Sequence, residues 1–201
     1  VEAAEGDWLG DLVTRIDRTP GVAGIGEVGL DRWIEDPDLE RQNHVFRLQL
    51  RLAAERNLPL TIHCLRAWGP LLEVLRAEPR PDRGFLIHSV GASPETIREL
   101  AFLGAYFSVS GPFADPNKKK YQKALEAIPE DRLLIETDAP DMLPPATHRL
   151  AVIADPATGK ELCHPFNLLC TYVFVREFFA WDEATLIKRV YANFERFFLE
   201  D

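Results

Sequence analysis

The sequence has 201 residues, of which 46% are hydrophobic, and this is typical of one globular domain with a sizeable core. Its formal net charge is −9 at pH 7, so it lacks the broad basic surface with which DNA-binding modules attract phosphate groups. This charge does not exclude an enzyme that acts on phosphates, because bound metal ions can supply the positive charge.

Cysteine usage and the N-terminus indicate the compartment. The three cysteines, Cys64, Cys163 and Cys170, form no CxxC pair and have an odd total, which argues against a disulfide framework and favours the reducing cytoplasm. No apolar run approaches membrane-spanning length, and the N-terminus has no leader pattern. The first residue is Val1 rather than methionine, so we expect this chain to begin inside a longer one. We predict a cytoplasmic protein that does not bind membranes.

Helices and strands alternate through the first half of the chain. Apolar residues at helical spacing predict helices over residues 6–18, 38–56 and 68–77. Short apolar runs predict strands over residues 22–26, 58–62 and 84–87. Asp7 is the expected N-cap of the first helix, and Asn57 can end the second. Directly after the three strands come three residues that can bind a metal ion, namely Glu27, His63 and His88.

The alternation continues in the second half. Two further strands are predicted over residues 105–109 and 133–135. Helices are predicted from Ser93 to Gly104 and over about 117–127, 166–179 and 182–198. The segment from Pro145 to about residue 163 contains Pro, Gly and Asp and predicts a long loop. The fifth strand is a buried apolar run that ends abruptly, with Asp138 standing just before Ala-Pro.

This order of elements predicts an α/β fold with a parallel sheet. Five strands are too few for a closed eight-stranded barrel, which typically takes about 250 residues. The residues alone therefore leave two architectures open, an open sheet and a barrel that lacks strands on its N-terminal side.

Four potential metal ligands follow four of the five predicted strands: Glu27, His63, His88 and Asp138. Because the carboxyl ends of parallel strands meet at one rim, these side chains are expected to lie together. Imidazoles with carboxylates suit zinc, manganese or similar ions, and a carboxylate can bridge two of them. Each residue alone has a simpler explanation, since a histidine can be a core residue and Asp138 can cap a turn. Four coincidences at one strand position favour a metal site.

Four segments resemble the successive signatures of TatD-family metal-dependent hydrolases, namely residues 24–31 (GIGEVGLD), 58–64 (LPLTIHC), 86–89 (LIHS) and 134–140 (LIETDAP). Residues 108–111 and 193–197 are also similar to family segments, so the resemblance covers essentially the whole chain. It implies a TIM-type (β/α)8 barrel of the metal-dependent hydrolase superfamily, with only about five barrel strands present in this chain. On this basis residues 1–201 form a single (β/α) barrel domain without its N-terminal strands.

The resemblance also implies a two-metal site, with Mg, Mn or Zn ions, and phosphoester hydrolysis, often 3′→5′ exonuclease action on DNA. Glu27 resembles the shared carboxylate and is assigned a catalytic role as well. His63 and His88 match the two single histidine ligands. Asp138 matches the aspartate that binds metal and orients the attacking water. Arg66 and His164 are the candidate substrate-binding residues.

Three features depart from the family pattern. The H-x-H pair of the first strand and the Gly-x-His-Pro motif that follows it are not in this chain. The family often has arginine two residues after the histidine of the His-Cys pair, whereas here that position is Leu65 and the arginine is Arg66. The late Asn-Glu-Pro is replaced by Cys-His-Pro at residues 163–165. The last two changes fall on substrate-contacting loops and leave the substrate open.

The sequence therefore leaves three functions open. The first is metal-dependent hydrolysis of phosphodiester bonds in DNA, with nucleic acid or a small phosphoester as the partner and no stable protein partner. The second is metal-dependent hydrolysis of amides, lactones or other small esters, since fold and metals do not set the substrate. The third is a non-catalytic metal-binding or scaffold protein.

Overall fold

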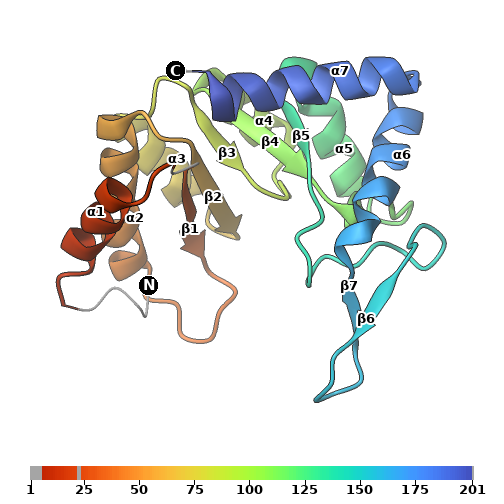
Figure 1. Cartoon of the computed structure of the whole chain (residues 1–201), viewed down its shortest axis with the longest axis horizontal. Helices are drawn as coiled ribbons and strands as arrows, with labels where there is room; N and C mark the ends of the chain where they lie inside the picture. The colour runs from red at the N-terminus through yellow and green to blue at the C-terminus, as the bar shows by residue number, and fades with distance from the viewer. Residues whose placement is uncertain (1–5, 22–23, 201) are drawn as a thin grey trace. The chain divides into compact units, whose positions relative to one another are not determined.

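The computed structural model describes residues 6–21 and 24–200 (Figure 1). Five strands form one sheet in the order β1-β2-β3-β4-β5, and the pairs β1–β2, β2–β3 and β4–β5 are parallel. The fold is therefore α/β, as the sequence predicts. The chain divides into two compact units, of which the first runs to Ile87 and includes the residues from Phe197 onward, and the second is His88–Arg196.

In its described residues, the first unit contains three helices and three strands: α1 (Trp8–Arg18), β1 (Ile25–Asp31), α2 (Leu39–Arg56), β2 (Leu60–Leu65), α3 (Trp68–Ala77) and β3 (Phe85–Ile87). The predicted caps are confirmed, because Asp7 accepts a hydrogen bond from the Gly10 amide and Asn57 ends α2 in the left-handed conformation. α2 packs against β1 (Figure 1), and each of the two elements has a fully buried side chain, Phe46 in α2 and Leu30 in β1. Burial of this apolar surface fixes β1 against its helix.

The first strand differs from its predicted position. Val22 and Ala23 lie outside the described residues, and β1 continues past Glu27 to Asp31. The prediction ended the strand at Glu27 because glycine and aspartate follow it, but Leu30 is completely buried and Asp31 still pairs with Leu65 of β2. Continued pairing with a neighbouring strand therefore outweighs the local turn signal.

The second unit contains four helices and four strands among the described residues: α4 (Pro94–Phe102), β4 (Ala105–Val109), α5 (Lys119–Ala127), β5 (Leu133–Ile135), β6 (Val152–Ala154), β7 (Glu161–Cys163), α6 (Leu168–Phe178) and α7 (Glu183–Phe194). Short 3-10 turns lie at η1 (Gly111–Ala114), η2 (Glu130–Arg132) and η3 (Pro165–Asn167), and a π-helical turn, η4 (Glu195–Leu199), follows α7. Ser93 and Asp182 cap α4 and α7 as predicted, accepting hydrogen bonds from Thr96 and Thr185.

The segment after Pro145 is not a plain loop, so that prediction was wrong for part of it. β6 and β7 pair antiparallel as a hairpin, with Val152 opposite Cys163. Each strand has only three residues, too few to show an alternating pattern in the sequence. Buried Asn167 fixes the base of the hairpin, since its side chain accepts from the Leu150 amide at 2.8 Å and donates to the Ala151 carbonyl at 2.7 Å.

The fifth strand is anchored by a buried amide of α7. The side chain of Asn193 is 2% exposed and donates to the Leu133 carbonyl at 2.8 Å and the Glu130 carbonyl at 2.9 Å. A buried carbonyl without a donor would cost about 1–3 kcal/mol, so these bonds hold β5 in place beside the helix. Because β5 is fixed in this way, the start of the segment that follows it and leads to Asp138 is also fixed.

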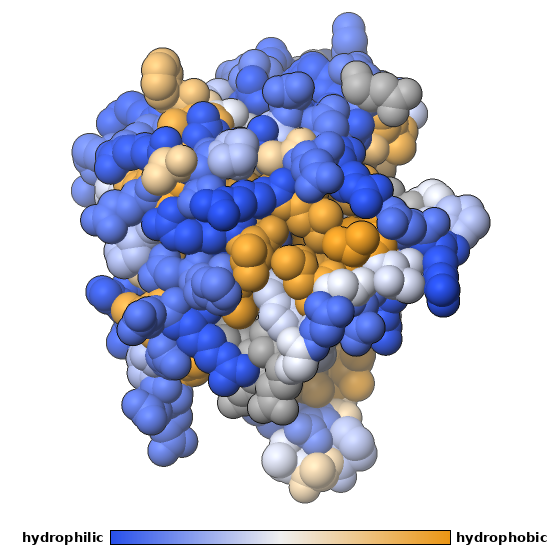
Figure 2. Space-filling view, turned by 90° about the vertical axis from the view of Figure 1, so that its left-hand side faces the viewer, coloured by the Kyte–Doolittle hydropathy of each residue, from blue (hydrophilic) through white to orange (hydrophobic). Residues whose placement is uncertain are grey.

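Polar and charged side chains cover most of the surface seen from the side of α1 and α2, with apolar side chains gathered near its centre (Figure 2). In the sheet order β1 comes first, so one of its edges has no partner among the described strands. No helix in the described part of the chain combines the length and apolar composition needed to cross a membrane.

Candidate metal site

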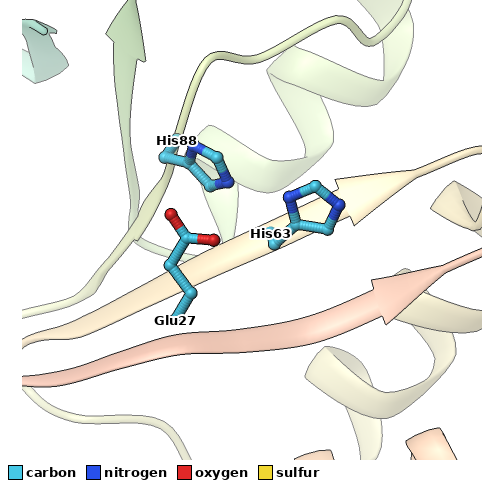
Figure 3. Close-up of side chains that lie close together, drawn as sticks. All are labelled: Glu27, His63 and His88. Carbon is cyan, nitrogen blue, oxygen red and sulfur yellow. The ribbon is translucent and has the colours of Figure 1, made fainter. Parts of the chain in front are cut away.

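Three of the four predicted ligands come together (Figure 3). Glu27 of β1, His63 of β2 and His88, which directly follows β3, each offer one ligand atom, and these atoms lie within 4.8 Å of one another. Glu27 points towards the two imidazole rings. One carboxylate oxygen and two imidazole nitrogens are the donor set that zinc, manganese and similar divalent ions take in proteins, so the residues fit such an ion.

A bulge in β1 sets the direction of Glu27. Ile25 pairs with Leu60 and Val28 with Ile62, so β1 takes three steps along its chain where β2 takes two. The extra residue changes the side-chain alternation at Glu27, and bulges commonly re-aim side chains in this way beside active sites. Glu27 is exposed, whereas Ile25 and Val28 on either side of the bulge are buried. Glu27 thus lies inside its strand rather than at the predicted end.

Gly29 brings the two strands unusually close at His63. Gly29 pairs with His63 in the register, has φ +131°, and a Cβ on it would lie 2.0 Å from the His63 carbonyl oxygen. Any other residue would both strain this backbone and push it away from His63. The glycine two residues after Glu27 therefore fixes the spacing between the first two ligands.

A carboxylate that the sequence analysis did not select holds the ring of His63. Asp31 Oδ2 lies 3.3 Å from His63 Nε2. Its other oxygen, Oδ1, accepts from the Trp33 amide at 2.6 Å. Gln42 of α2, only 3% exposed, fixes the Asp31 backbone, accepting from its amide at 2.7 Å and donating to its carbonyl at 2.9 Å. The one sequence signal for Asp31 is its place in the GEVGLD segment, and no sequence signal points to Gln42.

The first unit also has a cavity of about 690 Å³ beside Glu27 and His63. Its walls include Glu27, Asp31, Ile34, Glu35 and His63. This volume is in the range of small-molecule sites, and the wall combines apolar side chains with a few polar groups, as such sites do. A substrate could therefore reach Glu27 and His63 from this cavity.

In the second unit, His88 faces two acids that follow β5. Its Nδ1 lies 3.8 Å from Glu136 Oε1 and 3.8 Å from Asp138 Oδ1, and its side chain is only 7% exposed. Glu136 is held in turn, because its Oε1 accepts from the Ser89 amide at 2.7 Å. The Ser89 and Ser110 hydroxyls are 2.6 Å apart. The fourth predicted ligand, Asp138, thus lies beside His88.

The two predicted substrate-binding residues have different surroundings. Arg66 is exposed directly after β2, with its guanidinium carbon 4.7 Å from the centre of the Trp33 ring. His164 precedes η3, and its Nδ1 accepts from the Phe166 amide at 3.0 Å, which gives it a local capping role.

Next to His63, burial raises the pKa of the Cys64 thiol to about 12, so at neutral pH Cys64 packs as an uncharged side chain.

Comparison with known proteins identifies the family. The chain matches the family described as TatD related DNase over residues 1–199. The chain belongs to this family. It is 40% identical over 124 residues to YabD of Bacillus subtilis (strain 168), named an uncharacterized metal-dependent hydrolase, an alignment that covers 61% of this chain and 48% of that protein. It is 35% identical over 137 residues to a protein of Citrobacter koseri named 3'-5' ssDNA/RNA exonuclease TatD, covering 67% and 52%. The chain thus spans about half the length of the curated relatives it matches.

Solved structures of the TatD family share the fold. The crystal structure of YjjV, a TatD homologue from Escherichia coli K12, superposes with a TM-score of 0.84 at 25% identity, over 98% of this chain and 72% of that one. A TatD family hydrolase from Entamoeba histolytica gives 0.79 at 18% identity, over 98% and 69%. Residues 25–135 therefore supply five parallel strands of a TIM-type barrel, which confirms the predicted fold class.

Proposed function

We propose that the protein is a divalent-metal-dependent hydrolase that cleaves phosphodiester bonds in DNA. The observation that carries this proposal is the convergence of Glu27, His63 and His88 within 4.8 Å in a chain of the TatD related DNase family. The relative from Citrobacter koseri that is named as an exonuclease supports nucleic acid as the substrate. No second function has an observation of its own in this structure.

The proposed site would hold two divalent ions, of Mg, Mn or Zn. Glu27 and Asp138 would each offer a carboxylate to them, and His63 and His88 would each offer an imidazole. When bound, these ions would supply the positive charge that polarises a phosphoryl oxygen and lowers the pKa of water.

Asp138 is proposed as the group that takes a proton from the attacking water. Its carboxylate is part exposed, at 29%, so it can meet both a buried ligand and a solvent molecule. Asp31 has a supporting role in this proposal. Trp33 and Gln42 fix its position, and its free oxygen orients the His63 ring by hydrogen bonding to Nε2. The ring is then aligned before any ligand arrives.

The proposal also covers the domain, the partner and the cellular compartment of the protein. Residues 1–201 are taken as part of one (β/α) barrel domain, which the match of 98% of the chain to YjjV supports. Nucleic acid or a small phosphoester is the expected partner. A cytoplasmic setting is supported by three buried cysteines that are all free thiols.

The test is hydrolysis of a 5′-labelled single-stranded oligonucleotide by the purified protein with Mg²⁺, Mn²⁺ or Zn²⁺, against EDTA. We expect stepwise shortening from the 3′ end that stops in EDTA, together with two bound ions per chain by metal analysis. Turnover of an amide or lactone with intact DNA would favour the second function. Absence of both turnover and bound metal would favour a scaffold.

A further inference from the structure

Trp33 is a large aromatic side chain left in solvent beside the cavity. It is 64% exposed and lies in the bend that follows β1. The next two residues, Ile34 and Glu35, form part of the cavity wall together with Glu27 and His63. Ligand sites are lined largely by apolar and aromatic side chains. The bend therefore connects Trp33 directly to the proposed site.

Backbone hydrogen bonds hold the bend that carries Trp33. Its amide donates to Asp31 Oδ1 at 2.6 Å, and the neighbouring Arg32 amide donates to the Leu65 carbonyl at 2.9 Å, which continues the β1–β2 ladder. Arg66, the residue after Leu65, places its guanidinium 4.7 Å from the ring centre. The two strands thus bring a cation over one face of the indole.

A second tryptophan, Trp181, differs from Trp33 in having contacts on both faces of its ring. Trp181 has the guanidinium of Arg189 at 4.9 Å from its ring centre and also stacks on Phe179, with centroids 4.4 Å apart and planes at 13°. Both faces of Trp181 are thus in contact. Among residues 6–21 and 24–200, no second aromatic ring contacts Trp33. With Arg66 on one face and 64% of the residue exposed, the other face of Trp33 is open.

We propose that the open face of Trp33 stacks on a nucleobase of the substrate strand. This inference rests on the proposed function and adds to it a contact that recognises the base rather than the phosphate. Aromatic stacking and a nearby cation are the two features by which proteins bind single strands without sequence preference. The cavity wall carries three acids, Glu27, Asp31 and Glu35, so Arg66 supplies local positive charge for the adjoining phosphate.

The experiment compares two oligonucleotides of equal length and charge. One is ordinary single-stranded DNA, and the other has abasic tetrahydrofuran residues in its 3′-terminal segment. We expect Trp33→Ala to raise KM for the ordinary strand about tenfold, the effect of one lost base stack, with kcat and the abasic strand unchanged. Trp33→Phe should keep most of the affinity, because a smaller ring still stacks.

Two kinetic results would overturn the inference. An equal loss on both strands would mean that Trp33 only supports the bend, and no loss on either would mean that its ring contacts nothing in the complex. Because Trp33 is exposed, the alanine variant is expected to fold, and an unchanged melting temperature would verify this.

A binding measurement in EDTA separates this inference from the proposed function. The ordinary strand should quench tryptophan fluorescence and the abasic strand should not, and the quenching should vanish in Trp33→Phe but persist in Trp181→Phe. If the unmodified protein hydrolyses neither strand, the proposed function fails, yet this quenching would still support the stacking site. Equal quenching by both strands, or none by either, would contradict it.

Discussion

The two histidines of the site sit beside acids in very different settings. The His63 side chain is 33% exposed at the cavity, and Asp31 Oδ2 lies 3.3 Å from its Nε2. The His88 side chain is 7% exposed, with two acids at 3.8 Å and a network of serines next to them. A hydrogen bond to Asp31 orients the first ring, whereas surrounding packing restrains the second. Removing one acid should therefore matter in a different way on each side.

The largest effect is expected at Asp138, which lies beside His88 and is the proposed general base. Asp138→Ala should lower kcat on single-stranded DNA by about 10²–10⁴-fold, the usual contribution of a general base. The matched control is Asp141→Ala, because Asp141 is an exposed acid in the same turn. Retained activity in Asp138→Ala would contradict the role assigned to this residue.

The next effect tests the comparison directly through metal affinity. Asp31→Asn removes the charge that faces His63 and should weaken binding of Zn²⁺ or Mn²⁺ by about 10–100-fold, as loss of a carboxylate behind a ligating histidine does. Glu136→Gln should weaken it less, because Glu136 is 3.8 Å from His88 and the amide oxygen can still accept from Ser89. Isothermal titration calorimetry measures both.

Glu35→Gln is the control for these two variants, since Glu35 lines the same cavity and is exposed. It should change metal affinity little. If Glu136→Gln weakens binding as much as Asp31→Asn, the proposed difference between the two histidines is wrong, and simple loss of negative charge explains both results.

Much of the fold and part of the site could be predicted from the sequence. Residues 133–135 form the fifth strand as predicted, because a short apolar run bounded by polar residues has few alternatives in an alternating α/β chain. Glu27, His63 and His88 were predicted as ligands because the ends of parallel strands share one rim, although Glu27 and His63 lie inside β1 and β2 rather than at their ends. The structure brings these three together.

Other features depend on contacts that no local pattern encodes. The bulge at Glu27 arises from pairing between β1 and β2, so the sequence of either strand alone does not show it. Gln42 supports Asp31 across 11 positions of the chain, and its helix pattern looks ordinary. The β6–β7 hairpin was missed because its three-residue strands carry too little periodicity.

A smaller effect concerns how each side is anchored. On the His88 side, Asn193→Ala would leave the carbonyls of Leu133 and Glu130 without this donor and should lower the free energy of unfolding by about 1–3 kcal/mol. Urea denaturation monitored by circular dichroism measures it. Asn117→Ala is the control, since Asn117 is exposed, and it should change stability little. A loss that disappears at low pH would contradict a neutral hydrogen bond as the cause.

The smallest effect is the pH dependence of an ionic contact on the His63 side. Glu78, after α3, accepts hydrogen bonds from Arg51 and Arg47 of α2, and these contacts lower the pKa of its carboxyl group. A carboxyl group whose pKa is lower in the folded state stabilises the fold at neutral pH, and this contribution is lost as the pH falls through the folded-state value. Glu78→Gln should therefore lower the melting temperature at pH 7, and the difference from the unmodified protein should shrink in acid. The deficit of Asn193→Ala should stay constant over the same range, because an amide does not titrate. If the melting-temperature deficits of Glu78→Gln and Asn193→Ala changed with pH in the same way, the proposed difference between an ionic contact in the first unit and a neutral hydrogen bond in the second would be wrong.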